Sequence, residues 1–131
     1  MEVDLQALCD ESPFHRSLEA RITATSDGVA LTALTGDQFA VDGSRRAVHG
    51  GIIASLLDMA ATFALVARTG HDWVTVDLRV DYLRPTPVGP VSVNGEVIRA
   101  GRSIGRARGS LLDANGVLCA VAIGTFAPNP P

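Results

Sequence analysis

Lysine is absent from the sequence: all 11 basic residues are arginine. Chemistry that depends on a lysine amine, such as Schiff-base formation, is therefore excluded. There are only two cysteines, Cys9 and Cys119, and no Cys-x-x-Cys motif or Cys/His cluster accompanies them. The sequence thus predicts neither a disulfide framework nor a zinc site, and we expect no bound metal. Aromatic residues make up 5% of the chain, so its 47% hydrophobic content comes mostly from aliphatic side chains.

The chain also lacks a strong excess of charge. It has 14 acidic and 11 basic residues and a net charge of −3, which gives no electrostatic footprint for nucleic acid or an anionic membrane. The N-terminus has no basic segment followed by an apolar run, so no signal peptide is predicted and we expect a cytoplasmic protein. With 131 residues we expect one domain over 1–131, with flexible tails at 1–12 and 127–131.

One segment is typical of a long helix. Residues 51–68 contain no proline and no internal glycine, and they are apolar on almost all sides, which predicts a buried helix. Gly70 follows as a stop signal, and Arg68 suits the negative end of the helix dipole. The segment is nearly long enough to span a bilayer, but Asp58 in its middle and the strands that flank it argue against a membrane span.

The rest of the chain predicts strands. Residues 73–82 alternate, with five apolar side chains on one face, as expected for a half-buried antiparallel strand; these are Val74, Val76, Leu78, Val80 and Tyr82. Further strands are expected at 18–25, 29–34, 91–99, 104–112 and 117–126, and a loop at 38–48. Short turns join most of these strands, so the sheet is predicted to be antiparallel, with the four strands after the helix in a meander. We therefore expect an α+β hotdog fold, in which a sheet of five to six strands wraps around one long central helix.

Chemical signals gather at the start of the predicted helix. His49, Gly50 and Gly51 precede its first apolar residue. Glycines allow close approach of a ligand, and the free N–H groups of a helix N-terminus can polarise a carbonyl or hold an oxyanion. The same residues also suit an ordinary loop-to-helix junction. For His49, both a catalytic role and a role in fixing the loop remain open.

Asp58 is a carboxylate within an otherwise apolar helix. With Ser55 and Thr62 it forms one polar stripe, which faces either water or a polar site. Eight residues separate Gly50 from Asp58, or about 12 Å of helical rise. An oxyanion donor and a nucleophile must act within about 3 Å of the same reacting group. If both serve one reaction, they come from two subunits, so the sequence predicts a homodimer.

Two sequence runs resemble a known family. Residues 49–58 (HGGIIASLLD) and 75–85 (TVDLRVDYLRP) are similar to the helix and following strand of hotdog-fold acyl-CoA thioesterases of the phenylacetate-degradation type. The likeness extends from about residue 13 to 126. It implies hydrolysis of a small acyl- or aryl-CoA, with Asp58 as nucleophile or general base and the Gly50 N–H of the partner subunit polarising the carbonyl. It further implies hydroxyls near the acid at Thr62 and Thr75.

Several positions bear on the substrate. The family has Asn or Gln six residues before the histidine, and this chain has Gly43 there, next to Asp42 and Ser44. Gly51 and Ser55 are expected to contact substrate. Arginines suit CoA phosphates, and the candidates are Arg84, Arg99 and Arg102, with Arg106 and Arg108 on the next strand. Their alternative role is as solvated charges of a strand face. His15 and His71 are expected to be local structural or surface residues.

Two alternative functions stay open at this level. One is a hotdog enoyl-thioester hydratase or dehydratase, although the spacing of Asp42 and His49 does not match the Asp–His pattern of such enzymes. The other is a non-catalytic acyl-CoA-binding module. No cofactor is expected, because CoA is part of the substrate, and the expected assembly is a homodimer or a homotetramer made of two dimers.

Overall fold

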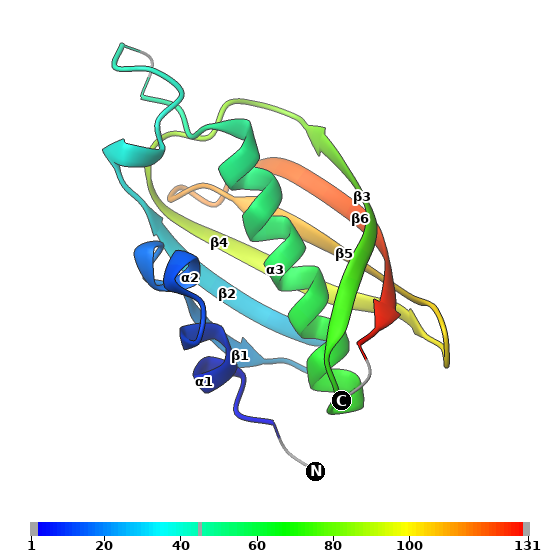
Figure 1. The fold of residues 1–131 in the computed structure, drawn as a ribbon. Helices are drawn as coiled ribbons and strands as arrows, with labels where there is room; N and C mark the ends of the chain where they lie inside the picture. Colours follow the sequence, from blue (N-terminus) through cyan, green and yellow to red (C-terminus); the bar gives the residue numbers. More distant parts are fainter. Residues whose placement is uncertain (1–2, 45, 130–131) are drawn as a thin grey trace.

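A computed structural model describes residues 3–44 and 46–129 of the chain (Figure 1). Its centre is the long helix α3 (Gly50–Thr69), which lies across one face of a six-stranded sheet. The other elements, in chain order, are α1 (Leu5–Asp10), α2 (Pro13–Ser17), β1 (Arg21–Ala24), β2 (Gly28–Thr35), a short 3-10 helix (Asp37–Phe39), β3 (Trp73–Tyr82), β4 (Gly89–Ala100), β5 (Gly105–Leu112) and β6 (Leu118–Pro128).

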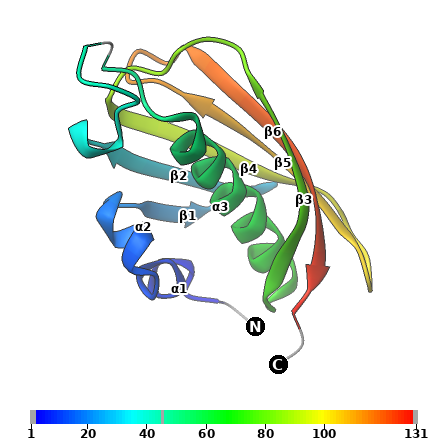
Figure 2. The ribbon, with the colours of Figure 1, turned by 45° about the horizontal axis from the view of Figure 1, so that its top comes forward.

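The sheet confirms the predicted hotdog fold. Its strand order is β1-β2-β4-β5-β6-β3, and every neighbouring pair is antiparallel. Figure 2 shows the sheet curving around α3, with the short helices α1 and α2 beside the β1 edge. The predicted strands at 29–34, 91–99, 104–112 and 117–126 all correspond to observed ones. The apolar face of α3 and the concave face of the sheet form one hydrophobic core.

The ends of α3 are fixed by local contacts. At the N-terminus, Nδ1 of His49 accepts a hydrogen bond from the N–H of Gly51 at 2.9 Å. At the C-terminus, Gly70 takes a left-handed conformation with φ of 79° and donates to the carbonyl of Val66, as the predicted stop requires. In its middle, α3 lies so close to β4 that a Cβ atom at Gly95 would overlap the carbonyl of Ala60. Glycine at this position therefore allows the helix to seat on the sheet.

Helix α3 has the length and apolar character of a membrane-spanning helix, with a mean hydropathy of 1.8 over its most apolar window. Half of that window is buried inside the fold. Ten α3 residues, among them Leu56, Leu57 and Leu65, pack within the hydrophobic core. A core helix enclosed by its own sheet accounts for this composition.

The N-terminal segment differs from expectation. The predicted flexible tail at 1–12 is wrong for residues 5–10, which form α1, because Leu5 and Cys9 are buried against the core. The expected strand at 18–25 is shorter, since the N-terminal part of this region follows helix α2. Ser12 caps α2 through its side chain and Pro13 occupies its first turn. Residues 1–2 of the expected tail lie outside the described residues.

The C-terminal segment is also more ordered than predicted. Strand β6 continues to Pro128, and its last residues pair with Trp73 and Val74 of β3. Asn129 then bonds to Asp72 through both its backbone N–H and its side chain. Of the expected tail at 127–131, residues 130–131 lie outside the described residues. Cys9 and Cys119 are both buried and are not joined by a disulfide.

Candidate active site

Asp58 is half-buried on the open side of α3 and is hydrogen-bonded to β3. The hydroxyl of Thr75 donates a short hydrogen bond, 2.6 Å, to Oδ1 of Asp58. Among the described residues, none hydrogen-bonds to Oδ2 of Asp58. The structure therefore brings together two of the residues that the resemblance implied as catalytic.

A β-bulge in β3 makes this bond possible. Trp73 bonds through Nε1 to Thr69, Thr75 bonds to Asp58, and Tyr82 bonds to the carbonyl of Gly50, so all three side chains reach the same helix. Positions 73 and 75 cannot share a face with position 82 in an unbroken strand, because side chains alternate. The pairing of β3 with β6 shifts register between Thr75 and Asp77, which inserts one extra residue on β3.

The bulge corrects the predicted alternation of 73–82. Leu78 and Val80 pack against the core, as expected, but Val74 and Val76 do not lie with them. They are 45% and 62% exposed, respectively. The expected single buried face of this strand is wrong, because the strand changes phase at the bulge and forms the edge of the sheet.

Gly50 lies at the first position of α3, where the carbonyls of the helix cannot reach its N–H. Its own carbonyl accepts the bond from the Tyr82 hydroxyl at 2.7 Å. Gly50 and Asp58 contact opposite ends of β3, through Tyr82 and Thr75 respectively, so they lie apart within one chain. Nδ1 of His49 accepts a hydrogen bond from the N–H of Gly51, a contact that fixes the loop at the start of the helix.

The other residues of the predicted stripe lie on the same half-exposed face of α3. Ser55 is one turn before the acid and donates to the carbonyl of Gly51 at 2.9 Å. Thr62 is one turn after the acid and lines a cavity described below. Gly51 is exposed at the N-terminus of the helix.

The candidate phosphate-binding arginines fall into two groups. Arg99, Arg102 and Arg106 line one depression of about 290 Å³ at the turn between β4 and β5. Gly105, at the end of that turn, pairs with Phe126, which in turn pairs with Thr75. The depression therefore begins about 10 Å from Thr75, or two strand spacings across the sheet.

The remaining arginines lie elsewhere. Arg84 follows the far end of β3, where its backbone N–H donates to the carbonyl of Cys119. Arg108 binds the carboxylate of Glu96 through Nε at 2.8 Å, so it serves an ion pair on the sheet. The structure thus separates Arg84 from Arg99 and Arg102 within one chain.

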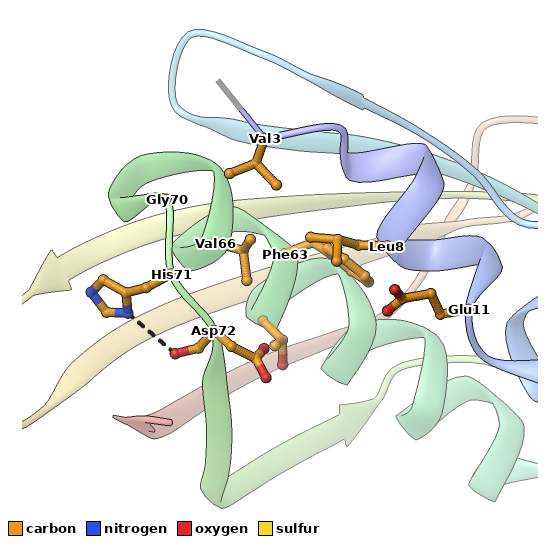
Figure 3. A pocket seen from close by; sticks show the side chains of 9 residues that line it. Val3, Leu8, Glu11, Phe63, Val66, Gly70, His71 and Asp72 are labelled. Atoms are coloured by element: carbon orange, nitrogen blue, oxygen red, sulfur yellow. Dashed lines mark hydrogen bonds between the residues drawn. The ribbon is translucent and has the colours of Figure 1, made fainter. Parts of the chain in front are cut away.

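A cavity of about 430 Å³ lies between α1, the C-terminal half of α3 and the segment that leads into β3 (Figure 3). Most of its lining is apolar, and it is bordered by carboxylates; the lining residues are Val3, Leu8, Glu11, Thr62, Phe63, Val66, Gly70, His71 and Asp72. Sequence reasoning did not find this cavity, because its walls come from α1, a helix that the sequence analysis did not predict.

The two remaining histidines have the local roles expected of them. His15 contacts the carbonyl of Cys9 through Nδ1 and packs edge-on against Phe63. His71 stacks on Trp73 with ring centroids 5.1 Å apart. Burial raises the pKa of the Cys9 thiol, with a smaller contribution from the neighbouring Asp10 charge. Among residues 3–44 and 46–129, no group of three or more His, Cys, Asp and Glu is arranged to hold a metal ion.

Tyr82 is the site residue that sequence reasoning missed. It was assigned to the buried face of the strand as an apolar residue, yet its hydroxyl holds the first residue of α3, and its ring lies 3.5 Å from the Cβ position of Gly50. It is the chain's only tyrosine. A polar tip at the end of a strand that precedes a turn was the available signal.

Comparison with known proteins places this geometry in a family. The sequence profile of the thioesterase superfamily matches residues 46–120. The medium/long-chain acyl-CoA thioesterase YigI of Salmonella typhimurium is 30% identical over 130 residues, which cover 87% of this chain and 84% of that protein. A Saccharolobus solfataricus protein named as an esterase is 35% identical over 80 residues, or 60% of this chain. The chain spans about half the length of that relative, 53%.

Solved structures agree with this assignment. The X-ray structure of a thioesterase-superfamily protein matches with a TM-score of 0.90 and 31% identity, covering 94% of both chains. The Escherichia coli PaaI protein, from the phenylacetic acid degradation operon, shares the fold with a TM-score of 0.79 at 21% identity, covering 94% of this chain and 92% of its own. Since the profile covers more than half of the chain, the chain belongs to the thioesterase superfamily.

Proposed function

We propose that the protein hydrolyses the thioester of an acyl-CoA, with Asp58 as the reacting carboxylate. The observation that carries the proposal is the 2.6 Å bond from Thr75 to Asp58 on the open side of the central helix. Membership of the thioesterase superfamily and the similarity to YigI support the same reaction. Thr75 acts as a positioning residue, because it fixes one carboxylate oxygen and directs the other toward the thioester.

Two chemical routes fit a carboxylate in this position. As a nucleophile, Asp58 attacks the carbonyl carbon, the C–S bond breaks, the CoA thiolate leaves and takes a proton from solvent, and water then hydrolyses the mixed anhydride. As a general base, Asp58 takes a proton from a water molecule while the oxygen of that water attacks the carbonyl carbon. The C–S bond then breaks, and the proton passes to the departing sulfur. Both routes build negative charge on the carbonyl oxygen, which needs a hydrogen-bond donor.

The N–H of Gly50 is the proposed donor, and it has to come from a second copy of the chain. Strand β3 is at the edge of the sheet, where its backbone groups on one side have no neighbouring strand, and it exposes apolar residues such as Val76. If two β3 strands pair antiparallel about an axis between residues 78 and 79, Thr75 of one copy lies opposite Tyr82 of the other. Thr75 marks the position of Asp58, and Tyr82 marks that of Gly50. The pairing therefore completes two sites from two half-sites.

The same two-fold axis brings candidate arginines of the two copies together. Arg84 of the second copy lies near the Trp73 end of β3 in the first copy. That end also carries Thr75 and the depression lined by Arg99 and Arg102. Guanidinium groups bind phosphates through paired hydrogen bonds. We therefore assign the nucleotide end of CoA to Arg99 and Arg102 of one copy, with Arg84 of the other copy nearby.

Release of free thiol from butyryl-, dodecanoyl- and benzoyl-CoA tests the reaction. We expect turnover by the wild-type protein and a loss of at least about 100-fold in kcat for Asp58→Asn, which keeps the shape of the side chain. A single turnover in ¹⁸O-water then identifies the nucleophilic route if label enters the Asp58 carboxylate, because water that attacks the Asp58 carbonyl of the anhydride leaves its oxygen there and the general-base route never labels Asp58. Full activity in Asp58→Asn would refute the assignment.

Mixing two inactive variants tests the shared site. Gly50→Pro removes the proposed donor at the first position of the helix, where proline is accepted and where the extended His49 (φ −57°, ψ 133°) tolerates it. After subunit exchange with Asp58→Asn, we expect about a quarter of wild-type activity, because half of the dimers are mixed and each mixed dimer holds one intact site. No recovery, or a monomer in size-exclusion chromatography, would contradict the shared site.

The same assays separate the alternatives. A non-catalytic binding module would bind acyl-CoA without releasing thiol, and the open position at Gly43, where the family has an amide, is the feature that favours it. A hydratase would add water to an enoyl-CoA and leave the thioester intact. The cytoplasmic location and the choice between dimer and tetramer stay predictions.

A further inference from the structure

The apolar cavity beside α1 starts next to the proposed reacting group. Thr62 lines it and lies one helical turn beyond Asp58, on the same face of α3. From there the cavity follows α3 past Val66 to Gly70, a helical rise of about 12 Å. Figure 3 shows Phe63 and Val66 between α1 and the segment that carries His71 and Asp72. The cavity therefore begins one helical turn from Asp58 and extends away from it along α3.

The cavity has an apolar floor and an acidic border. Its apolar wall comes from α1 and α3, through Leu8, Phe63 and Val66. Glu11 and Asp72 both line it, and no arginine is among the described residues that do. Asp72 is held in place by the N–H of Trp73 at 3.0 Å and by the side chain of Asn129. Its charge is thus a fixed part of the border.

We propose that this cavity receives the tail of the acyl group, and that it selects an aliphatic chain without a charge at its far end. The inference rests on the proposed thioesterase function and names the substrate class for that site. An apolar tail gains from burial against Phe63 and Val66. An ω-carboxylate enters the field of two carboxylates, and His71 is the one basic side chain among the described lining residues, so dicarboxylic acyl groups bind more weakly than uncharged ones.

The size and lining of the cavity set the expected effects. Each methylene moved from water into an apolar cavity improves affinity about three- to fourfold, until the cavity is full. Two exposed carboxylates at about 7 Å from an added negative charge weaken binding by about fivefold at low ionic strength, and salt reduces this effect.

Binding of S-alkyl-CoA thioethers tests the cavity without requiring turnover. By calorimetry we expect the affinity of the wild-type protein to rise from the butyl to the decyl compound. Leu8→Trp fills the cavity, and because Leu8 is 37% exposed, the larger side chain needs no rearrangement of the core. We expect it to remove most of the gain of the decyl compound and to leave butyl binding unchanged. Leu34→Trp, at a position 41% exposed and outside the cavity lining, is the matched control.

Several outcomes would overturn the proposal. These are a flat dependence on chain length, an equal loss for both thioethers in Leu8→Trp, or the same loss in Leu34→Trp. Turnover of butyryl-CoA together with a flat chain-length profile would reject the cavity and retain the thioesterase. Tight, chain-length-dependent binding of thioethers together with no thiol release from any thioester would reject the thioesterase function and retain the cavity as an acyl-binding site.

The acidic border has its own test. For this test, an S-alkyl-CoA thioether whose alkyl chain ends in a carboxylate is compared with the methyl ester of the same compound, which lacks the negative charge. We expect the ester to bind about fivefold better at low salt, with the ratio falling as salt is added, and Glu11→Gln to reduce the ratio about twofold. Equal binding of the two compounds, or a preference for the carboxylate, would reject the selection against charge.

Discussion

The bond between Thr75 and Asp58 leads to a specific kinetic prediction for Thr75→Val. This change replaces the hydroxyl with a methyl group of similar size and removes the donor 2.6 Å from Oδ1 of Asp58. Hydrogen bonds to charged groups contribute about 1.5–3 kcal/mol. Because Thr75 is exposed and water can replace part of the bond, we take the lower end of this range. That end corresponds to a decrease in kcat of about tenfold.

The assay is thiol release under saturating acyl-CoA. We expect kcat to fall and KM to stay nearly constant, because Thr75 orients the reacting carboxylate and is not assigned to substrate binding. Thr75→Ser keeps the hydroxyl and should recover most of the activity. Thr32→Val, an equivalent change at an exposed strand position in β2, should have no effect. If Thr75→Val keeps full kcat, or if the serine variant is equally impaired, the positioning role is refuted.

Three further predictions concern the surroundings of the site and the core. Tyr82→Phe removes the bond to the Gly50 carbonyl and should lower kcat/KM about three- to tenfold with no change in the oligomeric state by size-exclusion chromatography. Gly95→Ala forces a methyl group into the backbone of α3 and should lower the free energy of unfolding in urea by about 1–3 kcal/mol, whereas Gly43→Ala, with open space around it, should not. Burial raises the pKa of the Cys9 thiol, so its contribution to stability is fully present below the usual thiol pKa of 9.0 and is lost as pH rises above it. Urea unfolding at pH 8 and pH 10 should therefore show a larger decrease for the wild-type protein than for Cys9→Ala.

The central helix could be predicted because its signals are local. An apolar run without interruption, a Gly-Gly entry and a glycine stop together defined α3 to within two residues at either end. The candidate carboxylate followed from the same segment, since Asp58 is the one charged residue within it before Arg68. The order β4-β5-β6 followed from short turns such as Asn115-Gly116, where Gly116 has φ of 79°. The expected meander of four strands is wrong for β3, which pairs with β6 at the sheet edge while β4 pairs with β2.

The features that the sequence could not predict depend on contacts between distant segments. Helices α1 and α2 have six and five residues, too few for a clear helical period. Helix α1 buries Leu5 and Cys9 and is tied by the Gln6 side chain to the backbone of Ala20 and Ile22, 14 and 16 positions further along the chain. The cavity was missed for the same reason. The bulge in β3 was missed because the alternation over 73–82 is complete in the sequence, and the extra residue is visible only in the pairing with β6.

The bulge at Val76 also bears on how this strand can vary between proteins. In a regular strand, inserting or deleting one codon inverts every side chain that follows, so such changes are seldom tolerated. Here one unpaired residue already divides β3 into two segments: odd-numbered side chains face α3 before the bulge, and even-numbered side chains face it after the bulge. The segment at 73–75 serves the carboxylate, and the segment at 78–82 serves the helix N-terminus. Deletion of Val76 would leave Thr75 paired with Phe126 and Asp77 with Thr125 in regular alternation, so Thr75 and Tyr82 would both still face α3. Position 76 is therefore a place where this strand can gain or lose one codon and keep both half-sites.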